Sequence, residues 1–95
     1  AVNHIITIVM TSAATYVQVE HIETGKILRV EDTLILDDLI VFDGNNRVVY
    51  KNGTADMTIL TLASEFFLLQ RDDNPLNITT DGTCEAKISY VPVLL

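Results

Sequence analysis

Several residue types are scarce in this chain of 95 residues: it has one cysteine, two prolines, four glycines and no tryptophan. A single cysteine excludes an internal disulfide. Cys84 alternates with polar residues along a strand-like run, which predicts a small buried hydrophobe and not a reactive thiol. With few prolines and glycines, a chain that is 48% hydrophobic is expected to fold instead of staying disordered.

Basic residues are scarce as well, since 6 Lys and Arg stand against 13 Asp and Glu, for a net charge of −7. Nucleic acids and anionic membranes attract clustered basic residues, so this charge argues against both as partners. No apolar run approaches the roughly 20 residues of a membrane-spanning helix, and no signal peptide opens the chain. The start at Ala1 fits either a removed initiator methionine or a fragment of a longer protein.

Strand-like patterns fill most of the chain. Residues 83–90 alternate without a break, so Glu85 and Lys87 face one way and Cys84, Ala86 and Ile88 the other, as the two-residue period of a strand requires. We predict further strands at residues 4–10, 16–22, 26–30, 33–36, 39–42, 47–51, 66–69 and 76–80. Residues 4–10 are nearly continuous in apolar side chains, which is typical of a central strand. Residues 55–65 fit an extended crossover or a short helix, and their threonines favour the extended form.

The turns between these strands have recognisable chemistry. Gly25 separates residues 16–22 from 26–30, which we expect to pair as a hairpin. Asp43-Gly44 is the clearest turn signal and favours the left-handed backbone of hairpins, Gly53 follows Asn52 in a similar signal, and Pro75 ends an Asp-rich turn. Short strands separated by such turns predict one all-β domain over residues 1–95, a sandwich or a barrel. Its core is predicted to include Val17, Val19, Phe66, Phe67, Ile88 and Tyr90.

Residues that could support catalysis or bind a metal are few. His4 and His21 are the only histidines, and we interpret both as surface or edge-strand residues. No serine lies in a G-x-S-x-G motif. A zinc site would need His4, His21 and Cys84 from three separate strands, without the close ligand spacing of known sites. The sequence therefore predicts no catalytic residue, no cofactor and no metal.

Calcium binding and sugar stacking each have a simpler structural alternative in this sequence. The acidic pairs at residues 31–32, 37–38 and 72–73 could supply oxygen ligands for calcium, but Asp is also a favoured turn residue, and turn chemistry is the better interpretation. A sugar-stacking site needs exposed aromatic rings. Tryptophan is absent, and most of the three tyrosines and three phenylalanines fit core positions, which disfavours such a site.

Five segments, read in order, form a recognisable series: ETGKILRV, TLILDDLIVFD, NNRVVYKNG, SEFFLLQRDDNPLNI and ISYVPVLL. The series resembles the C-terminal domain of distal tail proteins of long-tailed, non-contractile bacteriophages, over nearly the whole chain. The matching residues are Thr24, Gly25, Asp38, Asp43, Arg47, Asn52, Gly53, Ser64, Phe66, Phe67, Leu69, Asn77, Tyr90, Val91 and Pro92. The chain departs from the family at residues 72–75, which replace a Pro-Gly, and at its end, which lacks the family's basic and aromatic residues.

The resemblance implies an antiparallel, galectin-like or jelly-roll β-sandwich of about eight strands. It also implies a structural, non-enzymatic role in the virion tail, at the tail tip or baseplate, assembled in the bacterial cytoplasm. The implied partners are other tail proteins, namely the tail tube, hub or receptor-binding proteins. The chain has no room for the N-terminal ring domain that such proteins also carry. The alternative is a carbohydrate-binding module that attaches the particle to a cell-surface glycan.

Overall fold

The computed structural model describes residues 3–62, 64–66 and 76–91. Within this part, the chain forms eight strands and one short 3-10 helix. In order they are β1 (Asn3–Met10), β2 (Ala14–His21), β3 (Lys26–Leu34), β4 (Leu39–Asp43), β5 (Val48–Lys51), β6 (Thr54–Ala55), η1 (Met57–Ile59), β7 (Leu76–Thr80) and β8 (Cys84–Val91).

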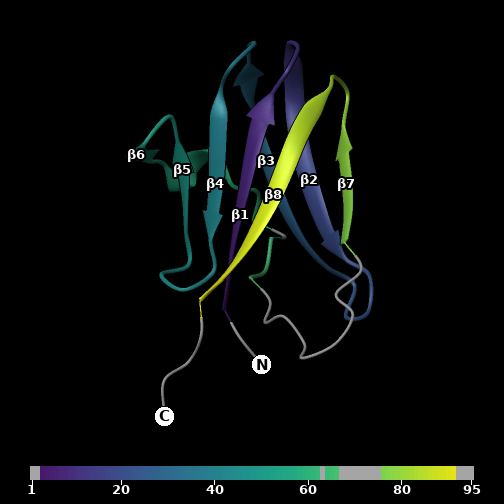
Figure 1. Ribbon diagram of the computed structural model, residues 1–95, viewed down its shortest axis with the longest axis vertical. Helices are drawn as coiled ribbons and strands as arrows, with labels where there is room; N and C mark the ends of the chain where they lie inside the picture. The colour runs from purple at the N-terminus through teal and green to yellow at the C-terminus, as the bar shows by residue number, and fades with distance from the viewer. Residues whose placement is uncertain (1–2, 63, 67–75, 92–95) are drawn as a thin grey trace.

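The strands form two antiparallel sheets that face each other (Figure 1). One sheet has the strand order β6-β5-β4-β1-β8, and the other has the order β3-β2-β7. The predicted all-β, antiparallel sandwich of about eight strands is therefore confirmed. So is the interior position of β1, which pairs with β4 on one side and β8 on the other.

The core lies between the sheets and follows from the alternation of the strands. In β1, Ile6, Ile8 and Met10 are fully buried, while the residues between them are only half-buried. Each sheet sends every second side chain inward, which is the two-residue period that the sequence shows. The other buried apolar residues are Ala14, Val17, Val19, Leu28, Val30, Leu34, Ile40, Phe42, Val49 and Ile59.

Four of the six predicted core residues have side chains that the structure describes. Val17 and Val19 are fully buried, and Phe66 and Ile88 are partly buried against the core. Phe67 lies outside the described residues. Tyr90 pairs with His4 through its backbone in β8, and its side chain lies outside the described part of the structure.

The hairpin of β2 and β3 is present as predicted, with Val19 paired to Leu28 and His21 to Lys26. Its turn places Gly25 at a φ of 72°, where glycine is favoured because it has no Cβ. The prediction of separate strands at residues 26–30 and 33–36 is wrong. β3 continues to Leu34, since a bulge absorbs one extra residue opposite the start of β2. Residues 35–38 are consequently a turn.

Two predicted turns differ in how they are built. Asn52 and Gly53 both have positive φ, 53° and 85°, which is the type I′ geometry of a two-residue hairpin between β5 and β6. The turn at Asp43-Gly44 lies where expected, but its left-handed residue is Arg47 (φ 55°) and not Gly44. The connection spans residues 44–47, so the left-handed residue falls at its end. Pro75 lies outside the described residues.

The Asp43 carboxylate closes that longer turn. Its Oδ1 accepts from the backbone N of Asn45 (3.0 Å) and of Asn46 (3.1 Å), and its Oδ2 accepts from Asn46 Nδ2 (2.9 Å). An aspartate that bonds the backbone two residues on is a common local turn device.

The interpretation of His21 as a surface or edge residue is wrong. His21 is 0% exposed, because β2 is the middle strand of its sheet and His21 shares the inward face of Val17 and Val19. Its Nδ1 lies 2.8 Å from Thr24 Oγ1 in the following turn. His4 lies in β1, and its side chain is outside the described part.

Ala86 is exposed, although the alternation of β8 puts it on the apolar face. It pairs with the buried Ile8, so the face is correct. Among the described residues, β8 is the edge strand of the larger sheet, and the opposite sheet has three strands against its five. A methyl group at this edge is therefore left uncovered.

Residues 55–65 combine the two forms that the sequence allowed. After β6, the Asp56 carboxylate accepts from Thr58 N (3.0 Å) and starts the single turn of η1. Leu60 is then extended and bridges Val30, and Ser64 N donates to Thr61 O (3.0 Å) in a turn. At the edge of β3, Thr61 N donates to Arg29 O (2.9 Å) and Glu65 N to Ile27 O (2.8 Å). Residue 66 is not in a strand, and residues 67–69 of the predicted strand lie outside the described part.

Candidate functional site

Four turns gather at one end of the sandwich, opposite the end where β1 begins and β8 finishes (Figure 1). We call this the loop end and define it as residues 10–14, 32–39, 51–54 and 80–85. Hydrogen bonds join the turns to one another. Met10 N donates to Asp38 O (2.9 Å), Asp37 N donates to Met10 O (2.8 Å), and Thr11 N donates to Thr83 O (2.9 Å). The loop end is therefore a continuous, bonded surface.

The Asp38 carboxylate holds two of these turns together. Only 7% of Asp38 is exposed. Its Oδ2 accepts from the backbone N of Ile35 (2.9 Å), and its Oδ1 accepts from Asn52 Nδ2 (3.0 Å). Asn52 in turn accepts from Leu39 N at its Oδ1 (2.8 Å). One carboxylate thus links the β3–β4 turn to the β5–β6 turn.

Lys51 is the cation of this cluster. Its Nζ lies 2.7 Å from Asp32 Oδ2 and 3.9 Å from Asp38 Oδ2, and it donates to Thr33 O (3.2 Å). The hydrogen bond from Lys51 lowers the pKa of Asp32, and the hydrogen bond from Asn52 lowers the pKa of Asp38. The hydrogen bond to Asp32 raises the pKa of Lys51. All three groups are therefore held in their charged forms.

These shifts predict how stability depends on pH. A carboxyl whose pKa is lower in the folded chain contributes stability above its unfolded pKa of about 4, and that contribution is lost as pH falls through the folded pKa. Lys51, with a raised pKa, contributes fully below about pH 10 and loses its contribution above that. We expect urea midpoints, measured by far-UV circular dichroism, to fall below pH 4.

The matched variant for this test is Lys51→Met. It removes the largest cause of the Asp32 shift and leaves the Asn52 bond to Asp38 in place, so the loss of stability in acid should be shallower than in the wild type. An acid profile identical to that of the wild type would contradict this assignment.

The β1–β2 and β7–β8 turns form the other half of the loop end. Thr83 N donates to Ser12 Oγ (2.9 Å), and Thr15 N and Oγ1 donate to the Asp81 carboxylate at 2.8 and 2.6 Å. Gly82 lies so close to the first turn that a Cβ built on it would be 2.4 Å from Ala13 O. A side chain at Gly82 would therefore push the two turns apart.

We expect Gly82→Ala to destabilise the fold by about 1–3 kcal/mol, because the backbone atom that it would meet cannot move away cheaply. Amide hydrogen exchange at Thr11, Thr15 and Thr83 should become faster. The control is Gly53→Ala, where φ is positive but no atom lies within 4 Å of the new Cβ. That variant should cost stability without affecting those three amides. Unchanged exchange in Gly82→Ala would contradict the close approach.

The outer face of the smaller sheet is a second polar surface. Arg29 lies over the Tyr16 ring, with its guanidinium carbon 4.1 Å from the ring centroid. The same guanidinium donates to Gln18 Oε1 (3.1 Å) and Glu31 Oε2 (3.2 Å). One face of the Tyr16 ring is therefore occupied by the guanidinium.

Ser64 bonds the segment that follows η1 to the edge of β3. Its Oγ accepts from Arg29 N (2.9 Å) and donates to Arg29 O (3.4 Å), and it lies 2.9 Å from Thr61 Oγ1. The hydroxyl thus serves the backbone groups at the edge of β3.

No group of three potential metal ligands gathers within the described residues. Cys84 is half-buried against the core, and burial raises the pKa of its thiol. Of the acidic pairs considered for calcium, residues 31–32 and 37–38 bind Lys51, Arg29 and turn backbone, and residues 72–73 lie outside the described part. Within the same described part, no helix is long and apolar enough to cross a membrane.

Comparison with known protein families identifies the family of this chain. Residues 1–93 match the model of the siphovirus-type tail component, C-terminal domain. The chain belongs to this family. The comparisons of this chain with curated proteins and with solved structures found no match. The match covers nearly all of the chain and confirms the resemblance to the distal tail family.

In this tail-component domain, the residues that carry the family resemblance mostly build turns and edges. Asp38, Asp43 and Asn52 close three turns, and Ser64 bonds the edge of β3. The ion pairs of Lys51 with Asp32 and Asp38 are not predicted from the sequence. The position of Lys51 beside Asn52-Gly53 was the available signal, but nothing in the spacing shows that Asp32 lies next to it in space.

Proposed function

We propose that this domain is a structural, non-enzymatic part of the tail tip or baseplate, a distal-tail-like domain that acts through protein–protein contacts. The family match over residues 1–93 carries the proposal. The contacts described above add support, because the polar side chains that could serve chemistry are engaged in turns, as with Asp38, Asp81 and Ser64. The expected partners are the tail tube, hub or receptor-binding proteins, and the expected location is the virion tail assembled in the bacterial cytoplasm.

Immunogold labelling of purified particles tests this function. An antibody against the domain should label the tail end that is distal to the capsid, and quantitative mass spectrometry of isolated tails should find the protein in a fixed ratio to the tail tube protein. Gold on the capsid, or absence of the protein from purified tails, would contradict the proposal.

The second candidate function is glycan binding, and the outer face of the smaller sheet is the surface that would serve it. Gln18 and Arg29 present hydrogen-bonding groups there, opposite Thr79 of β7. Against this function, Arg29 already covers one face of the Tyr16 ring. Isothermal titration with cell-wall polysaccharide of the host decides between the two functions. Binding at millimolar or tighter affinity that Arg29→Ala removes would favour the glycan function.

A further inference from the structure

Two large apolar side chains stand exposed at the tip of the β3–β4 turn. Ile35 is 59% exposed and Leu36 is 60% exposed, and they are adjacent in the chain. Turns favour Gly, Pro, Asn, Asp and Ser, each for a conformational reason, and none of these reasons applies to Ile or Leu. Neighbouring apolar side chains at a tip are a signature of a contact surface.

The turn that carries these side chains is held firmly in one conformation. Ile35 N donates to the Asp38 carboxylate (2.9 Å), and Asp38 N donates back to Ile35 O (3.1 Å). Asp37 has a φ of 71° and is fixed by its bond to Met10 O. A binding surface that is already ordered loses little conformational entropy when a partner binds.

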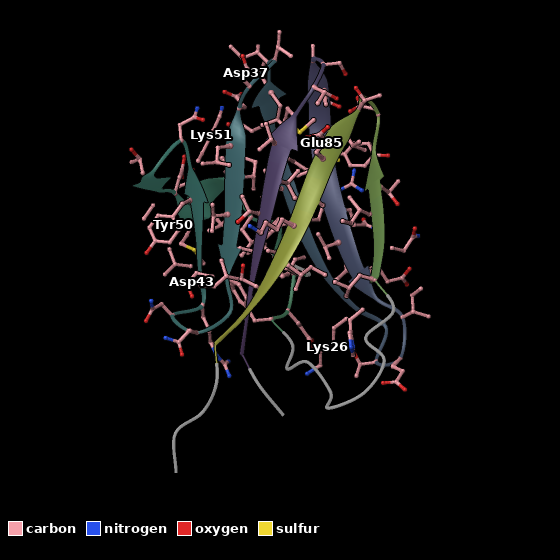
Figure 2. All side chains as sticks on the ribbon, in the orientation of Figure 1. Lys26, Asp37, Asp43, Tyr50, Lys51 and Glu85 are labelled. Carbon is pink, nitrogen blue, oxygen red and sulfur yellow. The ribbon has the colours of Figure 1, made fainter. Side chains whose placement is uncertain are left out.

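The surroundings of this tip are acidic. Within the loop end as defined, five carboxylates (Asp32, Asp37, Asp38, Asp81 and Glu85) stand against the single ammonium of Lys51, which gives a net charge of −4. Asp37 and Glu85 lie at the same end of the sandwich as Lys51 (Figure 2). Because the Lys51 ammonium lies 2.7 Å from the Asp32 carboxylate, these two charges neutralise each other. The electrostatic potential at the surface of this end is therefore negative.

We propose that the Ile35–Leu36 tip docks into an apolar pocket rimmed by lysine or arginine on a neighbouring tail protein. The proposal rests on the structural tail function above and specifies its surface and partner chemistry. The apolar pair supplies the central contact that excludes water. The surrounding carboxylates select a basic rim, since complementary charge across an interface speeds association and rejects acidic surfaces.

The first experiment replaces the tip in the complete protein of the virus that encodes it. In the double variant Ile35→Ser and Leu36→Ser, we expect the protein to fold as judged by circular dichroism. Its amount in purified tails, measured by quantitative mass spectrometry, should fall at least about tenfold, as loss of a central apolar contact predicts. The control is Leu62→Ser, which makes the same change as Leu36→Ser at a fully exposed leucine elsewhere on the surface. Incorporation of the control should be normal.

The second experiment tests the charge of the partner. Asp37→Asn keeps a residue that tolerates positive φ and removes one exposed carboxylate. Binding of the purified complete protein to tails isolated without it should therefore fall by roughly threefold at 0.15 M salt and differ less from the wild type at 0.5 M salt. The control is Glu23→Gln, an exposed carboxylate in the β2–β3 turn at the other end. Equal effects of the two substitutions would overturn the basic rim.

The possible outcomes distinguish a failure of this docking proposal from a failure of the proposed tail function. Normal incorporation of the serine double variant, or an equal loss with Leu62→Ser, would overturn the tip as the docking surface while leaving the tail function intact. Absence of the wild-type protein from purified tails would overturn the tail function itself.

Discussion

Phe42→Ala is expected to cost about 3–5 kcal/mol of the free energy of unfolding, because a fully buried aromatic side chain leaves both lost contacts and a cavity. Phe42 is 0% exposed in β4 and is the largest of the fully buried side chains in the described part of the chain. A domain of this size is stable by roughly 5–14 kcal/mol, so one substitution removes a large share. Since the chain has no tryptophan, urea unfolding followed by far-UV circular dichroism is the suitable measurement.

Val41→Ala is the matched control for that experiment. Val41 is the preceding residue of β4 and belongs to the opposite, half-buried face. Its replacement removes β-branching in the same strand without opening the core, so we expect a loss of roughly 1 kcal/mol or less. Similar losses for the two variants would mean that the inward face of β4 is assigned incorrectly.

Asp38→Ala is expected to cost about 2–4 kcal/mol, less than the sum of its two bonds, because the exposed Asn52 can bond to water instead. The substitution removes a charged acceptor from two hydrogen bonds, each worth roughly 1.5–3 kcal/mol when one partner is charged, and leaves the Ile35 N–H without its acceptor. It also removes one of the two carboxylates that lie within 4.0 Å of the Lys51 ammonium. Chemical denaturation gives the energy, and hydrogen exchange at Ile35 and Leu39 should show the loosened turns.

The neighbouring Asp37 supplies the control. Its carboxylate is exposed, and Asp37→Asn preserves a residue suited to the positive φ of 71°. We expect a change within about 0.5 kcal/mol, as for an ordinary surface substitution. If Asp37→Asn proved as costly as Asp38→Ala, the link between the two turns would not depend on the Asp38 carboxylate.

Local patterns in the sequence were sufficient for most strands and for the hairpin of β2 and β3. Alternation reports which side chains share a face, and Asn52-Gly53 reports a turn that needs two left-handed residues. These signals depend only on neighbouring residues. For that reason an all-β sandwich or barrel could be predicted from the strands and turns, and the resemblance to the tail family favoured the sandwich.

Burial could not be predicted as well, because it depends on where a strand lies in its sheet. His21 shares a face with Val17 and Val19, yet only the central place of β2 makes it fully buried. Ala86 is the reverse case, since an edge strand leaves it exposed on the apolar face. The end of β3 also differs from the prediction, because a bulge carries the strand past the interruption of its alternating pattern.

The candidate site was the least predictable part. Asp32, Asp38 and Lys51 come from three segments, and only the pairing of β4 with β5 and the folding back of β3 bring them together. The exposure of Ile35 and Leu36 depends on the turn that the Asp38 carboxylate closes, and no local pattern in the sequence predicts it.

The pairing of β1 with β8 sets the order in which the domain can be completed during synthesis. Among the described residues, the first strand, β1, has the last strand, β8, as a neighbour, with Asn3 beside Val91 and Met10 beside Cys84. Until β8 leaves the ribosome, β1 presents an apolar edge with unpaired backbone groups, which is the kind of edge that recruits other chains. Contacts between residues this distant in sequence also slow folding. The backbone groups on this side of β1 therefore stay unpaired until β8 has been synthesised.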